Sequence, residues 1–339
     1  MSHPRHILLG PQAGVHALPV CDHYSGVPAR MRKSLQLQAQ LAQEMGACIF
    51  DVTLDCEDGA AIGAELEQAR SVTALWHEVQ SLGPAQGAKV RIGVRLHPVD
   101  HPAFALDVQT IVGSAAGQLA FVMLPKVESR SQVDQAISQI DPQAVDIRLP
   151  IHVLIESPAA LHQVFSIAAH PRVQSMSFGL MDFVSAHGGA IPASAMALGG
   201  SGAALDQFHH PLVLRAKMEI ASACHAHGKV PSHCVVTELR DTAAIEAAAR
   251  QAAQAFGFTR MWSIHPDQIR PILRGFAPTG DEVEQAAAIV LAAAAQDWAP
   301  IAVDGQLHDR ASYRYFWQVL ERAHRTAVVL PLAVRHYFA

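Results

Sequence analysis

The 339-residue sequence predicts an α/β protein, a (β/α)8 TIM barrel that is followed by a C-terminal helical lid or appendage. Eight short β-rich runs alternate with helical patterns over about 250 residues, which is typical of such a barrel. Half of the residues are hydrophobic, so a large core is available. A doubly wound open sheet is the competing fold. No Gly-x-Gly-x-x-Gly motif follows the first run, which weakens the dinucleotide-binding form of that fold.

The expected elements follow from local patterns. The eight strands are expected at residues 6–9, 48–54, 90–96, 120–124, 151–155, 175–178, 233–236 and 260–264. Amphipathic spacing predicts helices at residues 29–46, 131–140, 158–170, 212–228, 239–257 and 281–296. We place the barrel domain at 1–296 and a lid segment at 297–339. The long Gly-, Ala- and Ser-rich stretch 185–211 is expected to be a functional or mobile loop.

Composition narrows the class of protein. Charged residues make up 16% of the chain, the formal net charge is −5, and no basic stripe is present. We therefore expect no nucleic-acid partner and no membrane surface. The five cysteines are odd in number and form no Cys-x-x-Cys pair, which favours reduced thiols in the cytoplasm. The longest apolar run is shorter than the ~20 residues that span a bilayer.

Ionisable residues follow almost every expected strand. They would therefore lie at the carboxyl-terminal ends of the strands, where parallel barrels have their active sites. They are Asp55, Glu57, Asp58, Arg95, His97, Lys126, Glu128, Glu156, Asp182 and His265. Polar residues are also expected at strand ends because the chain meets solvent there. For each position alone, solvent exposure explains the ionisable residue as well as a functional role does. The whole set is harder to explain in that way, because carboxylates gathered on one rim repel each other.

A hard divalent cation would remove this repulsion. Glu156 and Asp182 come from neighbouring strands and predict a Mg²⁺ site, with Mn²⁺ as a substitute ion. The forked donors of Arg95 suit a carboxylate or a carbonyl oxygen, and together with Mg²⁺ they would stabilise an enolate. Lys126 is interpreted equally as a ligand for a substrate phosphate or carboxylate and as the partner of a rim acid. His265 is a further substrate-binding candidate.

Seven short motifs between about residue 48 and residue 310 follow the order that they have in a known family. They are "LDCEDGA", "VRLHP", "LPKVES", "VLIESPAAL", "FGLMD", "GFTRMWSIHPDQI" and "VDGQLHD". Together they resemble the citrate lyase β-subunit-like (HpcH/HpaI aldolase) family, which includes malyl-CoA and citramalyl-CoA lyases and belongs to the phosphoenolpyruvate-binding barrel superfamily. The resemblance implies a Mg²⁺-dependent lyase that cleaves a β-hydroxyacyl chain by a retro-Claisen or retro-aldol route.

The same resemblance assigns roles to residues. It implies Glu156 and Asp182 as metal ligands and Arg95 as the anchor for the enolate and carboxylate. Asp55 and Glu57 would lie near metal-bound water and substrate. Asp309 matches an acid of a C-terminal lid that often covers a neighbouring subunit, which implies a homotrimer or hexamer. The alternative for Asp309 is the N-cap of a helix that begins at "RASYRYF".

Some features depart from the family pattern and leave alternatives open. The N-terminal stretch is longer than in the family, His97 stands where the family has an Asn, and the 185–211 loop is unusually long. Arg5, Arg30, Arg32 and Lys33 are candidates for binding phosphates. The expected substrate is a small acyl-CoA. One alternative is a CoA-free aldolase that acts on a 4-hydroxy-2-oxo acid, and another is a barrel that binds a ligand without catalysis.

Overall fold

The chain folds into two compact units. The computed structural model describes residues 3–10, 13, 17–59, 61–81, 90–199 and 205–338. One unit comprises residues 19–275, and the other combines the N-terminal 18 residues with residues 276–339. We describe each unit by itself.

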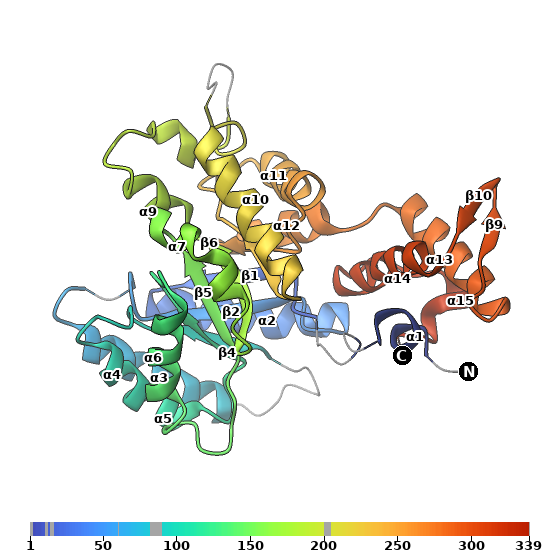
Figure 1. The fold of residues 1–339 in the computed structure, drawn as a ribbon. Coiled ribbons are helices and arrows are strands. Elements are labelled where there is room, and N and C mark those ends of the chain that lie inside the picture. The colour runs from blue at the N-terminus through green and yellow to red at the C-terminus, as the bar shows by residue number, and fades with distance from the viewer. Residues whose placement is uncertain are drawn as a thin grey trace. The chain divides into compact units, whose positions relative to one another are not determined.

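The larger unit is a closed barrel of eight parallel strands in sequential order, which confirms the predicted TIM barrel (Figure 1). The strands are β1 (Cys21–Ser25), β2 (Phe50–Asp55), β3 (Ile92–Arg95), β4 (Phe121–Leu124), β5 (Ile151–Ile155), β6 (Val173–Phe178), β7 (Val230–His233) and β8 (Arg260–Ser263).

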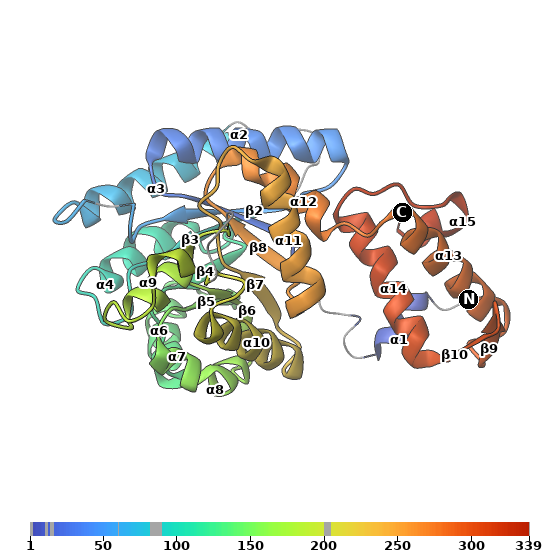
Figure 2. The ribbon, with the colours of Figure 1, turned by 90° about the horizontal axis from the view of Figure 1, so that it is seen from above.

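Helices surround this barrel, as the view from above shows (Figure 2). The α-helices are α2 (Pro28–Met45), α3 (Glu65–Ser81), α4 (Phe104–Asp107), α5 (Gly113–Ala115), α6 (Arg130–Ile140), α7 (Pro158–His162), α8 (Val164–Ala168), α9 (Leu180–Ser185), α10 (Pro211–Ala226), α11 (Thr242–Phe256) and α12 (Ile269–Phe276). A π-helical segment η2 (Val108–Val112) follows α4, and 3-10 turns lie at η3 (Ala193–Met196) and η4 (Pro266–Gln268).

The first strand is not where the sequence pattern placed it. Residues 6–9 belong to helix α1 (Pro4–Leu9), in which Pro4 occupies the first turn and the His3 ring accepts a hydrogen bond from the main-chain N–H of Arg5. The true first strand is the polar segment Cys21–Ser25. The seventh strand begins at Val230 and shares only His233 with the expected range.

A cluster of ion pairs lies at the amino-terminal end of the barrel. Asp22 and Asp51 are register neighbours on β1 and β2. The guanidinium of Arg260 is fully buried and lies 2.9 Å from Asp22 Oδ2 and 2.7 Å from Asp51 Oδ2. Arg91 Nε lies 2.7 Å from Asp51 Oδ1. The two acids and two arginines balance in charge, which makes their burial tolerable.

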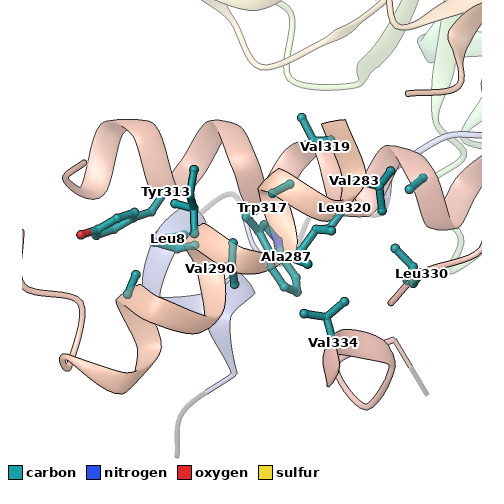
Figure 3. Packing of buried hydrophobic residues seen from close by; sticks show 14 of the residues in the cluster. Leu8, Val283, Ala287, Val290, Tyr313, Trp317, Val319, Leu320, Leu330 and Val334 are labelled. Atoms are coloured by element: carbon teal, nitrogen blue, oxygen red, sulfur yellow. The ribbon is translucent and has the colours of Figure 1, made fainter. Parts of the chain in front are cut away.

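The smaller unit is mainly helical. It contains α1, α13 (Gly280–Ala295), α14 (Arg310–Arg325), α15 (Leu332–Arg335) and an antiparallel hairpin of β9 (Ile301–Val303) and β10 (Gln306–His308). Figure 3 shows its core, in which Leu8, Val290, Trp317 and Val334 pack together.

The boundary between the units differs from the expected one at 296/297. Helix α13 packs against α14 through residues such as Val283 and Leu320, so it joins the smaller unit and the division falls at 275/276. The connector that was expected to be turn-rich forms the hairpin. Asp304 and Gly305 at its tip have φ values of 49° and 75°, as a type I′ turn requires.

Candidate active site

Arg95 is the centre of a charged cluster at the carboxyl ends of β2 and β3. Its Nε lies 2.5 Å from Asp55 Oδ1, its Nη1 lies 2.9 Å from Glu57 Oε2, and its Nη2 lies 2.9 Å from Asp58 Oδ2. Asp55 and Arg95 are register neighbours on the two strands, which brings them together. Arg95 and Asp55 are buried, whereas the side chain of Asp58 is 63% exposed.

The carboxylate of Asp55 receives donors on both oxygens. Oδ1 accepts from Arg95 and from the main-chain N–H of Glu57, and Oδ2 accepts from Gly59 N at 2.6 Å and from the hydroxyl of Tyr24 at 2.5 Å. Asp55 therefore holds Arg95 and Tyr24 in place.

Tyr24 is a site residue that the sequence reasoning missed, because the first strand was misplaced. Its hydroxyl also accepts from Arg95 Nη2 at 3.1 Å, and the Arg95 guanidinium carbon lies 4.8 Å from its ring centre. The ring stacks on Trp262 of β8 at 5.9 Å. This strand is the polar segment "CDHYS", so hydrophobic alternation gave no local signal for it.

Lys126 forms an ion pair with a rim acid, which is one of the two roles that the sequence predicted for it. Its Nζ lies 2.6 Å from Glu57 Oε1, so Glu57 links Lys126 to Arg95. Burial raises the pKa of Glu57, and Arg95 and Lys126 oppose this rise.

Glu156 and Asp182 line a single cavity of about 440 Å³, together with Pro98, Asp100, Lys126, Glu128, Gln132, Ser157, Ala160, Ser185 and Ala186. Glu156 directly follows β5, is 5% exposed, and accepts a hydrogen bond from Lys126 N at 2.7 Å. Burial raises the pKa of Glu156 to about 7, and the charges of Glu57 and Asp182 add to this rise. Asp182 lies in the first turn of α9 and is exposed.

A glycine makes room for Glu156. Ile155 pairs with Phe178, so the next residues along the two chains, Glu156 and Gly179, face each other. A Cβ on Gly179 would lie 2.8 Å from Cδ of Glu156 and closer still to its Cγ. The orientation of the Glu156 carboxylate therefore depends on the absence of a side chain at residue 179.

The two acids fit a magnesium ion better than a transition metal. Within the described parts of the chain, no three His, Cys, Asp or Glu side chains are grouped to hold a metal. Mg²⁺ usually takes one or two carboxylates and completes its shell with water and substrate oxygens. Glu156 and Asp182 supply that number of carboxylates.

Two other predicted residues have local structural roles. His265 follows β8, and its Nδ1 accepts from the main-chain N–H of Asp267 at 3.3 Å, so it caps η4 and is not among the residues that line the 440 Å³ cavity. Asp309 belongs to the smaller unit and is the N-cap of α14, where it accepts from Ala311 N at 2.9 Å and takes part in a capping box. A catalytic role for Asp309 remains a prediction.

Comparison with known proteins places the chain in a family. The HpcH/HpaI aldolase/citrate lyase family matches residues 35–266, about two thirds of the sequence. The chain belongs to this family. It is accordingly an enzyme of the lyase class, as the motifs predicted. None of the described helices is long and apolar enough to cross a membrane.

Individual relatives agree with this assignment. A crystal structure of a citrate lyase from Burkholderia xenovorans LB400 is 44% identical, with a TM-score of 0.78 over 97% of this chain and 99% of that one. The L-malyl-CoA/β-methylmalyl-CoA lyase of Rhodobacter capsulatus is 27% identical over 294 residues, which are 82% of this chain and 88% of the relative. The CitE protein of Mycobacterium tuberculosis, in complex with magnesium, acetoacetate and coenzyme A, is 24% identical with a TM-score of 0.66 over 91% of this chain and 99% of that one, and shares the fold.

Proposed function

We propose that this enzyme is a Mg²⁺-dependent carbon–carbon lyase that cleaves or forms a β-hydroxyacyl-CoA, such as malyl-CoA or citramalyl-CoA, through an enolate. The observation that carries the proposal is the pair Glu156 and Asp182 in one cavity with Lys126, which Glu57 connects to Arg95. The malyl-CoA and citramalyl-CoA lyases among the relatives support the substrate class.

The charge of the rim favours a bound cation. The carboxylates of Asp55, Glu57, Asp58, Glu156 and Asp182 outnumber the cations Arg95 and Lys126. Glu156 and Asp182 would hold the ion. Once bound, Mg²⁺ would polarise substrate oxygens and thereby lower the cost of charge that develops during cleavage.

The side chains divide the remaining tasks. Arg95 would bind the carboxylate of the oxo acid, and Asp58 is the contact it would give up, because the pairs with Asp55 and Glu57 are buried. In cleavage the substrate hydroxyl loses its proton to a base, and a carbonyl forms there. The electrons of the broken carbon–carbon bond pass to the α-carbon of the thioester, which is then protonated. Glu57 is the best-placed base, and Asp309 of the smaller unit is the alternative.

A groove beside α2 suits the nucleotide part of a CoA ester. A cavity of about 600 Å³ is lined by α2 and α12 and by Thr242 and Pro266, which follow β7 and β8 at the carboxyl-end rim. Of the four N-terminal cations considered for phosphates, Lys33 lines this cavity, whereas Arg32 pairs with Glu78 and Arg5 belongs to the smaller unit. We assign the phosphates of the ester to the Lys33 side of the groove.

A turnover panel tests the function. Malyl-CoA, citramalyl-CoA and several CoA-free 4-hydroxy-2-oxo acids are incubated with and without Mg²⁺, and the products are identified by mass spectrometry. Cleavage of a CoA ester only with Mg²⁺ is expected. Cleavage of the free acids alone would replace the proposal with the aldolase alternative, and Lys33→Ala should raise KM only for CoA esters.

The metal assignment has a separate test. Glu156→Gln should abolish Mg²⁺ binding in titration calorimetry and abolish turnover, while circular dichroism shows an intact fold. Asp100→Asn is the matched control, because Asp100 lines the same cavity without belonging to the pair. Unchanged Mg²⁺ affinity in Glu156→Gln would disprove the assignment.

We further propose a homotrimer or hexamer in which Asp309 serves the site of a neighbouring subunit. Light scattering measures the assembly size. Asp309→Asn should lower activity if Asp309 serves the site. Mixing it with the inactive variant Glu156→Gln should restore part of the activity if the lid acts between subunits, and mixing should restore none if each lid serves its own barrel.

A further inference from the structure

Lys126 has a backbone conformation that lysine rarely adopts. It is the second residue after β4, in the loop that leads to α6, and its φ is 52°, in the left-handed region that favours glycine. Asparagine tolerates this region, whereas a β-branched residue is a clear outlier there. Strain of this kind persists only where the surrounding contacts enforce it, and it is common at functional sites.

Two contacts hold Lys126 in this conformation. Its main-chain N–H donates to Glu156 Oε2 at 2.7 Å, and its Nζ lies 2.6 Å from Glu57 Oε1. Glu156 follows β5 and Glu57 follows β2, so Lys126 joins two parts of the rim that are not adjacent in the barrel. A glycine at this position would relieve the strain but would lose the ion pair with Glu57. The lysine therefore serves both acids at once.

The same hydrogen bond determines which oxygen of Glu156 is free. Oε2 accepts from Lys126, whereas Oε1 lies on the side of Gly179, where a Cβ would come 2.5 Å from it. Among the described residues no donor reaches Oε1, and this atom is not shut off from the cavity that Glu156 lines. The carboxylate is thus fixed on one side by a donor and given room on the other, with Oε1 available for a ligand.

We propose that Lys126 is a positioning residue for the metal site, whose left-handed backbone turns its main-chain N–H toward Glu156 and thereby keeps Oε1 of that carboxylate available to the ion. Hydrogen bonds that orient a ligating group typically change metal affinity by about 10- to 100-fold. This role belongs to the main chain and not to the ammonium group. The effect on ion binding rests on the proposed Mg²⁺ site, whereas the hydrogen bond itself does not.

Four substitutions at residue 126 separate the backbone from the charge, because all four remove the ammonium group. Lys126→Gly and Lys126→Asn keep the left-handed conformation, whereas Lys126→Ala and above all Lys126→Val disfavour it. In titration calorimetry of the whole protein, Lys126→Gly and Lys126→Asn should bind Mg²⁺ alike. Lys126→Val should bind it roughly 10-fold more weakly, with Lys126→Ala between. Equal affinities in Lys126→Gly and Lys126→Val would overturn the proposal.

Asp146 provides the matched control. It also has a left-handed φ, of 62°, but it lies between α6 and β5, at the amino-terminal end of the barrel. Asp146→Gly and Asp146→Val should differ in thermal stability as the corresponding Lys126 variants do, yet they should bind Mg²⁺ with the same affinity. A similar loss of affinity in Asp146→Val would show that any strained loop weakens the site through the fold, which would refute a specific role of Lys126.

Amide hydrogen exchange gives a readout that needs neither metal nor substrate. Removal of the acceptor in Glu156→Ala should make the Lys126 N–H exchange roughly 10-fold faster than in the wild type. An unchanged exchange rate would contradict the hydrogen bond on which the proposal depends. If Glu156→Gln binds Mg²⁺ as the wild type does, the proposed metal site fails. If Glu156→Gln loses Mg²⁺ but Lys126→Val retains it, the metal site stands and the role of Lys126 fails.

Discussion

Gly179→Ala tests whether a missing side chain positions Glu156, the proposed ligand for the metal. Gly179 has φ −88° and ψ 79°, so alanine meets no left-handed strain there. The added Cβ would overlap Cγ, Cδ and Oε1 of Glu156. Such overpacking costs about 1–3 kcal/mol. Alanine also lowers the conformational entropy of the unfolded chain relative to glycine, which stabilises the folded protein by about 0.4–1 kcal/mol. We expect a net loss of stability of about 1–2 kcal/mol.

A double-mutant cycle isolates the clash. In a Glu156→Ala background the atoms that would collide are absent, so Gly179→Ala should become neutral or stabilise the barrel by about 0.4–1 kcal/mol. Denaturant unfolding of the four proteins gives the coupling energy. Gly117→Ala is the control, because its nearest atom would be Ile147 Cδ1 at 3.6 Å. An equal cost of Gly179→Ala in both backgrounds would refute the reasoning.

Calorimetry should show the functional effect of the same substitution. The displaced carboxylate should weaken Mg²⁺ binding by roughly 10-fold. Unaltered affinity in Gly179→Ala would mean that Glu156 has another productive orientation.

Three further predictions concern other charged side chains. Asp58→Asn removes an exposed ion pair with Arg95 Nη2 that is worth about 0.2–1 kcal/mol. Because Arg95 no longer has to give up this contact to bind the substrate, KM should fall by up to about 5-fold while kcat stays constant in steady-state assays. Burial lowers the pKa of Lys217 to about 8. Between that pH and about 10.5 the unfolded chain retains a proton that the folded chain has released, so wild-type stability should gain up to about 3 kcal/mol with rising pH in denaturant titrations, relative to Lys217→Met. Asp309→Ala should cost about 1 kcal/mol through loss of the cap, whereas Asp309→Asn should keep stability, so a fall in kcat in Asp309→Asn alone would identify an acid–base role.

The barrel and its rim acids were predictable because they depend on local pattern and on one general rule. Alternation of β-rich and helical segments gives the fold, and parallel strands bring their carboxyl ends to one rim. Arg95, Asp55, Glu57 and Glu156 lie at that rim as predicted. Their ion pairs were not predictable, because register determines which carboxylate meets which arginine atom.

The first strand could not be predicted from hydrophobicity. Asp22 faces the inside of the barrel, and its partner Arg260 is 238 residues away in the sequence. The apolar run at residues 6–9 is a helix because its leucines pack against α14 of the smaller unit. The Asp304–Gly305 hairpin, in contrast, carried a recognisable local signal in "VDGQ".

The smaller unit is built from two segments that lie on either side of the barrel in the sequence, and this affects how the chain folds during synthesis. Helix α1 leaves the ribosome before every strand of the barrel, and α13 and α14, which cover its leucines, leave it after all of them. Domains generally fold as units while the chain is being made. The barrel segment can thus fold while Leu8 and Leu9 still lack their partners. A chain that terminates before residue 280 would retain every strand of the barrel and yet expose these leucines permanently, which would mark the truncated product for aggregation or degradation.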